Sequence, residues 1–85
     1  MTFDDESRFD GANYSFRARD EDGNKVTAQV SEEAFESYDR EVCLSVAKAL
    51  YSGGKFSEER GYRLVEVHRH HVIAYDQRIS FQKRS

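Results

Sequence analysis

The sequence predicts a small α+β domain with an N-terminal β-hairpin, one long or kinked helix and C-terminal antiparallel strands, in the order ββαββ. Three observations predict this fold class. Two runs of alternating apolar and polar residues flank a glycine-containing turn, apolar residues then recur at helical spacing, and alternating runs return towards the C-terminus. Because strands and helix are not interleaved as βαβ units, we expect an antiparallel sheet with helix packed on one face.

Length and composition favour one domain, residues 1–85, because each half of the chain would fall near the limit of about 40 residues below which folding alone usually fails. Six Phe and five Tyr argue against intrinsic disorder, although 34% of the residues are charged. A single cysteine excludes an intramolecular disulfide. No run approaches the roughly 18 apolar residues of a membrane helix, and the acidic start is unlike a secretory signal. We therefore expect a cytoplasmic protein without membrane contacts.

The first two strands are predicted over residues 13–20 and 25–30. In each run apolar side chains occupy every second position, which is typical of a strand with one buried face. Between them, Asp22-Gly23 lies where a tight reversal needs a positive φ. The two runs therefore predict a β-hairpin. The residues before it, 1–12, are expected to form an acidic leader.

A helix is predicted over residues 31–52. Ser31 suits its N-cap, and acidic residues in the first turn complement the positive end of the helix dipole. Gly53-Gly54 supplies a stop that tolerates a left-handed conformation. Asp39 is a second candidate N-cap, so the segment is either one long helix or two short ones. Its core-facing residues form a stripe about 120° wide: Phe35, Tyr38, Val42, Val46, Ala49 and Leu50.

The same helix carries a second apolar stripe. Leu44, Ala47 and Tyr51 recur at helical spacing on nearly the opposite side, and the polar strip over these turns is narrow. A helix so broadly apolar is normally covered on more than one side. Two interpretations stay open: the leader or the C-terminal strands fold over this stripe, or a second subunit does, most simply in an isologous dimer. These three residues are therefore the candidate interface of a homo-oligomer.

The C-terminal part is predicted to complete the sheet. Residues 55–61 are expected to be a polar loop with Phe56 as an apolar plug, and residues 62–67 a third strand. Residues 71–83, with apolar side chains on one parity, predict a fourth strand that bends near residues 76–77.

Short motifs over the N-terminal two thirds of the chain resemble those of a known family. They are Phe3, Phe9-Asp10, Phe16-x-Ala18, Gly23-x-x-Val26 and Ala28-x-Val30-Ser31-x-Glu33-Ala34-Phe35. In these motifs the chain resembles a small bacterial family designated domain of unknown function 1488, in which an aromatic-Asp pair precedes a hairpin and an I/V-S-x-E-A-L step leads into a helix. The glycine pair and residues 70–85 depart from the family's pattern. The resemblance implies a fold and carries over no catalytic residue.

The sequence His68-Arg69-His70-His71 is a candidate metal or pH-sensitive site. On a strand, His68 and His70 would share a face, a spacing that suits two ligands of one metal ion. A zinc site needs a third and usually a fourth ligand, and the chain has no second cysteine. The alternative is a polar turn between two strands. We favour the turn and expect no metal or other cofactor.

No catalytic set is evident in the remaining motifs. Cys43 has nothing nearby in sequence to activate it, so we expect it to pack at the apolar margin of the helix. Gly53-Gly54-Lys55 follows a helix, whereas phosphate loops place their glycines before one. The carboxylates of the leader and the hairpin turn are expected to be solvated. The sequence therefore predicts a protein that is not an enzyme.

Charge is distributed unevenly along the chain. Residues 1–39 hold 4 basic and 11 acidic side chains, a net charge of −7, whereas residues 40–85 hold 9 basic and 5 acidic side chains, a net charge of +4. The acidic hairpin could face the basic strands within the fold or across a subunit boundary. The basic half also mixes cations with aromatic residues, as surfaces that bind single-stranded nucleic acids do. Its candidate contacts are Arg63, Arg69, Arg78, Lys83 and Arg84.

Two functions remain as hypotheses. The first is a non-enzymatic interaction or accessory protein that self-associates, most simply as a dimer. The alternative is a weak nucleic-acid-binding protein that uses the basic C-terminal strands.

Overall fold

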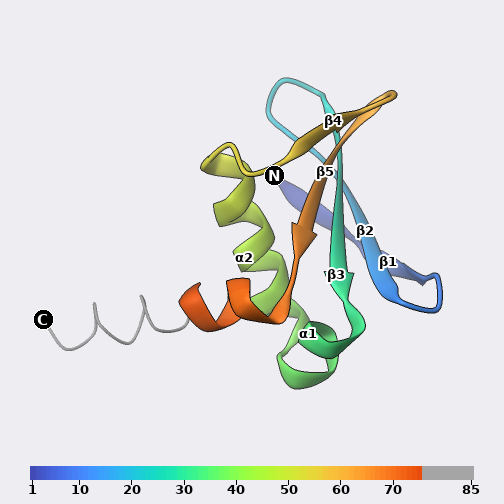
Figure 1. Ribbon diagram of the computed structural model, residues 1–85. Helices are drawn as coiled ribbons and strands as arrows, with labels where there is room; N and C mark the ends of the chain where they lie inside the picture. Colours follow the sequence, from blue (N-terminus) through green and yellow to red (C-terminus); the bar gives the residue numbers. More distant parts are fainter. Residues whose placement is uncertain (76–85) are drawn as a thin grey trace, which may run out of the picture.

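The computed structural model describes residues 1–75 and confirms an α+β fold (Figure 1). Helices lie along one side of a five-stranded sheet, and the strand order is β1-β2-β3-β5-β4. A third helical segment occupies residues 69–75. The elements are β1 (Thr2–Phe9), β2 (Asn13–Arg19), β3 (Lys25–Ser31), α1 (Glu32–Ser37), α2 (Arg40–Ser52), β4 (Ser57–Glu59) and β5 (Tyr62–Val67).

The sheet is mixed, so the wholly antiparallel arrangement predicted from the sequence is wrong. Strands β1, β2 and β3 form an antiparallel meander, but β5 pairs with β3 in parallel, from Val26↔Arg63 to Val30↔Val67. Parallel neighbours need a crossover of a dozen or more residues, and α1, α2 and β4 supply it. The expected polar loop contains β4, which pairs antiparallel with β5 at the edge of the sheet.

The expected acidic leader is instead strand β1, at the opposite edge. It pairs with β2 through Phe3↔Ala18 and, after a register shift, through Ser7↔Phe16. Phe3 is only 7% exposed, so burial of its ring anchors the strand to the core. Asp10 builds the turn that follows by accepting hydrogen bonds from the backbone N–H groups of Ala12 and Asn13, at 2.9 and 2.8 Å.

The predicted helix over residues 31–52 is two helices. Ser31 caps the first, because its Oγ accepts a hydrogen bond from the Ala34 N–H at 3.2 Å. Tyr38 is extended, with φ −136° and ψ 156°, and this conformation ends α1. Asp39 occupies the N-cap position of α2, although its side chain makes no capping hydrogen bond.

One broad face of α2 packs against the sheet. Its buried residues are Cys43, Leu44, Val46 and Ala47, which combine members of both predicted stripes. Leu44 is 8% exposed and Ala47 is fully buried. The second stripe is therefore covered within one chain, mainly by the core that strands β1, β2, β3 and β5 share with the helices.

Residues 69–75 are helical, so the strand predicted over residues 71–83 is wrong for residues 71–75. The remainder of that predicted strand lies outside the described residues. Val72 is fully buried and Tyr75 packs against the core. The spacing of these two residues suits one face of a helix. The helical segment begins with hydrogen bonds from the N–H groups of His71 and Val72 to the His68 carbonyl.

Candidate functional site

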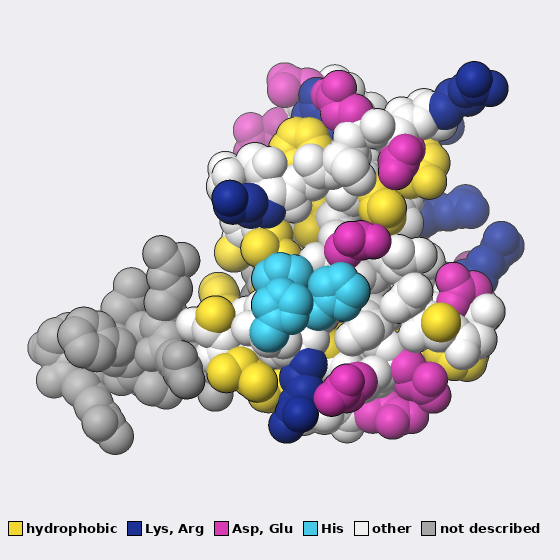
Figure 2. All heavy atoms as spheres, viewed as in Figure 1, with side chains coloured by type: hydrophobic (Ala, Val, Ile, Leu, Met, Phe, Trp, Pro, Cys, Tyr) yellow, Lys and Arg dark blue, Asp and Glu magenta, His cyan; other side chains and the backbone are white. Residues whose placement is uncertain are grey.

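The side of the sheet opposite the helices, here called the open face, is basic at its centre. Residues paired directly across neighbouring strands project from the same side of a sheet. Arg17 pairs with Thr27 and Arg19 with Lys25, so their side chains alternate with the buried Phe16, Ala18 and Val26 and project from the open face. Figure 2 shows Lys and Arg side chains extending to the right of the molecule, away from the helices.

Arg8 of β1 lies opposite Ser15 and projects from the same face. All four basic residues of the first 39 therefore share the open face, although this part of the sequence has a net charge of −7. The acidic residues of β1, at positions 4–6, lie at the register shift between Phe3 and Ser7. At the centre of the sheet, β2 and β3 contain three cations and no carboxylate.

The three central cations, Arg17, Arg19 and Lys25, are called the basic patch below. All three are exposed. Within residues 1–75, the ion pairs involve Arg40, Arg63 and Arg69 and none of the basic patch. Arg19 donates a hydrogen bond to the Gly23 carbonyl at 3.4 Å, which leaves its charge uncompensated. The patch therefore keeps its positive charge available to a partner.

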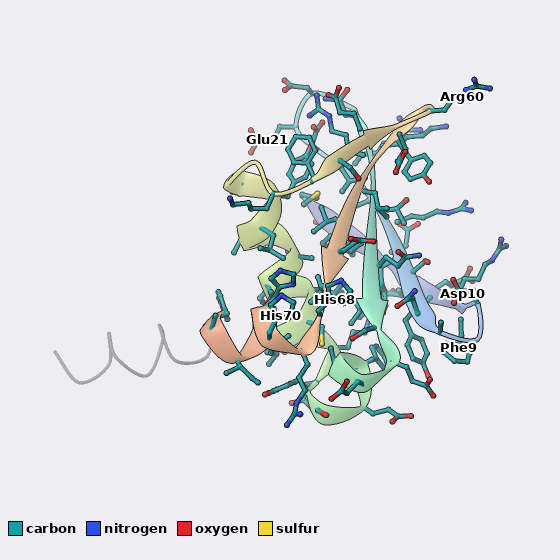
Figure 3. The ribbon with its side chains drawn as sticks, in the orientation of Figure 1. Phe9, Asp10, Glu21, Arg60, His68 and His70 are labelled. Atoms are coloured by element: carbon teal, nitrogen blue, oxygen red, sulfur yellow. The ribbon has the colours of Figure 1, made fainter. Side chains whose placement is uncertain are left out.

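An exposed aromatic ring lies beside the basic patch. On the parallel strands β3 and β5, Lys25 and Tyr62 each come one residue before the paired Val26 and Arg63. Arg19, Lys25 and Tyr62 thus form a row across three neighbouring strands, which are about 4.8 Å apart. Tyr62 is 39% exposed. Arg60, labelled in Figure 3, extends from the tip of the adjacent β4–β5 turn.

The remainder of the open face is polar. Thr27 and Gln29 are half-buried between the basic patch and β5, and Leu64 is half-buried opposite Thr27. Glu66 and Glu59 carry negative charge at the β5 and β4 side of the face. The open face is therefore positive over β2 and β3, negative towards β4, and poor in apolar side chains.

Arg63, which the sequence suggests as a nucleic-acid contact, points to the helix side of the sheet. Its Nη1 donates a hydrogen bond to the Tyr51 hydroxyl at 2.8 Å and lies 3.5 Å from Oδ2 of Asp20. Its Nη2 lies 3.4 Å from Oε1 of Glu58, and its guanidinium stacks 5.1 Å from the Phe56 ring centroid. These contacts occupy the charge of Arg63 within the fold.

The other suggested contacts do not join Arg63 on a common surface. Arg69 begins the last helical segment and forms an ion pair with Glu33 at 3.3 Å. Arg78, Lys83 and Arg84 lie outside the described residues. The nucleic-acid surface predicted over the C-terminal strands is therefore not assembled by residues 1–75, and the cations that do gather come from the N-terminal half.

Tyr51, a predicted interface residue, is part of the same internal network. Its hydroxyl donates a hydrogen bond to Oδ2 of Asp20 at 2.6 Å. Hydrogen bonds from Tyr51 and Asn24 lower the pKa of Asp20 to about 2, and burial together with the Asp20 carboxylate raises the pKa of Tyr51. This network ties the β2–β3 turn to the end of α2 and to β5. No spacing in the sequence signals it, because its members are far apart along the chain.

The three histidines gather at the start of the last helical segment, with ring centroids 4.1 to 5.6 Å apart (Figure 2); His68 and His70 are labelled in Figure 3. His71 caps it, because the His68 N–H donates a hydrogen bond to Nδ1 of His71 at 3.0 Å. Burial and the neighbouring His70 and His68 lower the pKa of His71. Among residues 1–75, no group of three or more His, Cys, Asp or Glu side chains has the geometry to hold a metal ion.

A shallow groove of about 530 Å³ lies next to the histidines. Ser31, Glu33, His68, Arg69, His70 and Ile73 line it. Two of these lining residues, Glu33 and Arg69, form an ion pair with each other. The groove therefore presents a neutralised pair of charges, in contrast with the basic patch.

The remaining sequence candidates have structural roles. Cys43 is fully buried, its Sγ lies 3.7 Å from the Ala34 carbonyl oxygen, and burial followed by the nearby Asp39 charge raises its pKa. A thiol held in its neutral form is a poor nucleophile. Gly53 and Gly54 end α2 through hydrogen bonds from their N–H groups to the Ala49 and Tyr51 carbonyls, which confirms the predicted helix stop.

No family model matches the chain, and no curated protein or solved structure is significantly similar to it. The resemblance to domain of unknown function 1488 therefore stays a prediction. None of the helices within residues 1–75 has both the length and the apolar character needed to cross a membrane.

Proposed function

We propose that this protein is a non-enzymatic binding protein that holds a polyanionic partner on the open face of its sheet. The observation that carries the proposal is the basic patch: Arg17, Arg19 and Lys25 are exposed, form no ion pair within residues 1–75 and have no carboxylate beside them on β2 and β3. Three like charges on adjacent positions repel one another. A polyanion relieves this repulsion and releases its own condensed counterions on binding.

The chemistry of the patch suits phosphate groups in particular. Arginine presents a planar fork of donors that matches phosphate oxygens in a bidentate manner, and lysine adds a compact point charge. Arg17 and Arg19 are two residues apart on one strand, so their side chains leave the sheet about 7 Å apart. A chain of phosphates could therefore contact both arginines and Lys25 at once.

Two observations support a role without catalysis: the thiol of Cys43 is buried, and most carboxylates of the N-terminal half are exposed to solvent. Cys43 is buried against a backbone carbonyl, away from solvent. Most of the acidic side chains of residues 1–39 are exposed at turns, on β1 or on α1. Neither arrangement provides the nucleophile and base within hydrogen-bond reach that covalent catalysis requires.

Self-association remains a prediction, but α2 no longer supplies its surface, because Leu44 and Ala47 are buried in the chain's own core. The exposed large apolar side chains among residues 1–75 are Phe9, Tyr62 and Ile73, which lie on three different elements. Such scattered residues do not provide the apolar centre of a stable dimer interface.

The polyanion proposal is tested with fluorescently labelled inorganic polyphosphate, whose anisotropy is followed as the intact protein is added at several salt concentrations. We expect tight binding at low salt and a steep loss as salt rises. The double substitution Arg17→Ala/Lys25→Ala should reduce the slope of log affinity against log salt by about 2, one for each phosphate contact removed.

The matched control is Lys48→Ala/Lys55→Ala, which removes two exposed cations from α2 and the loop that follows it. Its net charge equals that of the test variant, so a nonspecific charge effect would weaken both variants alike. Equal weakening, or no binding by the wild type at low salt, would overturn the proposed function.

A further inference from the structure

We infer that the polyanion is a single-stranded nucleic acid and that Tyr62 is the platform on which one of its bases stacks. The inference rests on the proposed function and adds a partner to it. It starts from the row that Arg19, Lys25 and Tyr62 form across β2, β3 and β5. Surfaces that bind single strands combine cations that contact the phosphates with aromatic rings that contact the bases.

Tyr62 differs from the other aromatic residues of the sheet, which within residues 1–75 either pair with another aromatic ring or, like Phe3 at 7% exposed, are buried. The rings of Phe9, Tyr14, Phe35 and Phe16 pack against one another in succession, with neighbouring centroids 4.1 to 5.9 Å apart, and Tyr51 packs on Phe56 at 4.7 Å. Tyr62 belongs to none of these aromatic pairs within residues 1–75. It is 39% exposed and lies on the open face, so part of its ring is available to a base.

The cations nearest the ring lie on one side of it, towards β3 and β2. Lys25 lies next to Tyr62 on the neighbouring strand, and Arg19 lies one strand further. On the β4 side, Glu59 lies directly opposite Tyr62 on the open face, so the strand approaches the ring from β3; Arg60, two residues before Tyr62 at the tip of the β4–β5 turn, is exposed. A short single strand that crosses β2, β3 and β5 can therefore place a base on Tyr62 while its phosphates contact Arg19 and Lys25.

Other polyanions and a second copy of the chain fit less well. A double helix offers no unstacked base, and an α-helix or a two-stranded ribbon, not a broad sheet face, fits its major groove. A second copy would bury Asn13, Ser15, Thr27 and Gln29 with few apolar neighbours, whereas the core of a protein interface is depleted in charged residues and enriched in aromatic ones. The combination of cations and one exposed ring favours a partner with both phosphates and bases.

The test compares three labelled ligands of equal phosphate number: an oligouridine 12-mer, an abasic 12-mer and linear polyphosphate. We expect the oligouridine to bind more tightly than the other two. Tyr62→Ala should weaken oligouridine binding by about 5- to 150-fold, the range expected for the loss of one base stack, and should leave the other two affinities unchanged. Tyr62→Phe, which keeps the ring, should bind all three as the wild type does.

The outcomes separate the two proposals. If all three ligands bind equally and Tyr62→Ala changes none of the affinities, the nucleic-acid inference is wrong while polyanion binding stands. If none of the ligands binds, both proposals fail. Light scattering adds a further outcome: a dimer that Arg17→Ala/Lys25→Ala disrupts would assign the open face to a second copy. Tyr62 is partly exposed, so we expect Tyr62→Ala to remain folded. Thermal unfolding of this variant checks that expectation.

Discussion

The hydroxyl of Tyr51 and the carboxylate of Asp20 share a hydrogen bond of 2.6 Å that joins the last turn of α2 to the β2–β3 turn. The Asp20 carboxylate also accepts hydrogen bonds from the N–H groups of Asp22 and Asn24, at 3.0 and 2.8 Å, and so defines the turn itself. The turn follows directly on Arg19 and leads into Lys25. The internal network therefore fixes the end of the sheet where two members of the basic patch lie.

Tyr51→Phe should destabilise the protein without opening a cavity. The substitution removes the hydrogen bond to the Asp20 carboxylate and the hydroxyl oxygen that accepts from Arg63, and we expect the Tm to fall by at least roughly 4 to 8 °C, the change that a loss of about 1 kcal/mol produces in a domain of this size. Thermal unfolding followed by circular dichroism measures the change. Tyr62→Phe is the control, because it removes a hydroxyl from an exposed residue and should leave the Tm unchanged.

The contribution of Asp20 to stability should disappear in strong acid. The pKa of Asp20 falls from 3.8 to about 2 on folding, chiefly because Tyr51 and Asn24 donate hydrogen bonds to the carboxylate. A depressed pKa stabilises the fold fully above pH 3.8, and this stabilisation is lost as the pH falls through about 2. The difference in Tm between wild type and Tyr51→Phe should therefore be constant above pH 4 and narrow below it. A difference that widens in acid would contradict this role.

Mild acid should loosen the C-terminal helical segment. The pKa of His71 lies below its ordinary value of 6.5, first because of burial and then because His70 and His68 oppose a further positive charge, although Glu66 acts in the other direction. The folded state then binds fewer protons than the unfolded state, so stability falls as the pH drops below about 6.5. Protonation of Nδ1 also removes the acceptor of the His68 N–H.

His71→Asn provides the comparison for this pH effect. Its side-chain oxygen can replace Nδ1 as a hydrogen-bond acceptor but does not titrate. We expect the Tm of the wild type to decline between pH 7 and pH 5 more steeply than that of His71→Asn. Parallel declines in the two proteins would assign the pH effect to other groups.

Leu44→Ala tests whether α2 is covered within one chain. Because Leu44 is 8% exposed in the core, its truncation should lower the free energy of unfolding by about 2 to 4 kcal/mol. The unfolding midpoint of both variant and wild type should not change with protein concentration. Lys48→Ala on the exposed side of α2 should be nearly neutral. A midpoint that rises with concentration in the wild type but not in Leu44→Ala would restore α2 as a subunit interface.

Strong local patterns in the sequence predicted the elements that they describe. The alternation over β2 and β3 and the Ser31 cap both have their expected counterparts in the structure. Strand β1 was missed because charges at positions 4–6 interrupt its alternation, and β4 because all three of its residues are exposed. The final helical segment was mistaken for a strand because Ile73 and Tyr75 alternate, whereas the buried Val72 and Tyr75 share a helical face.

The candidate site was only partly visible in the sequence. Arg17 and Arg19 occupy the polar positions of a predicted strand, which already places them away from the core. The net charge of the N-terminal half concealed them, because the acidic residues outnumber them but lie elsewhere in the fold. Their proximity to Tyr62 depends on the parallel pairing of β3 and β5, a contact between distant segments that no local pattern encodes.

Carboxylates border the sheet on both sides, in β1 at one edge and in Glu58 and Glu59 of β4 at the other. A further strand that paired with either edge would have to lie beside these negative charges. If that strand came from a second copy of the chain, its own acidic edge residues would repel them. The register shift in β1 also interrupts the regular row of backbone hydrogen-bonding groups with which an added strand would pair. Lateral polymerisation is thereby opposed, and the broad side of the sheet becomes the direction from which another molecule can approach.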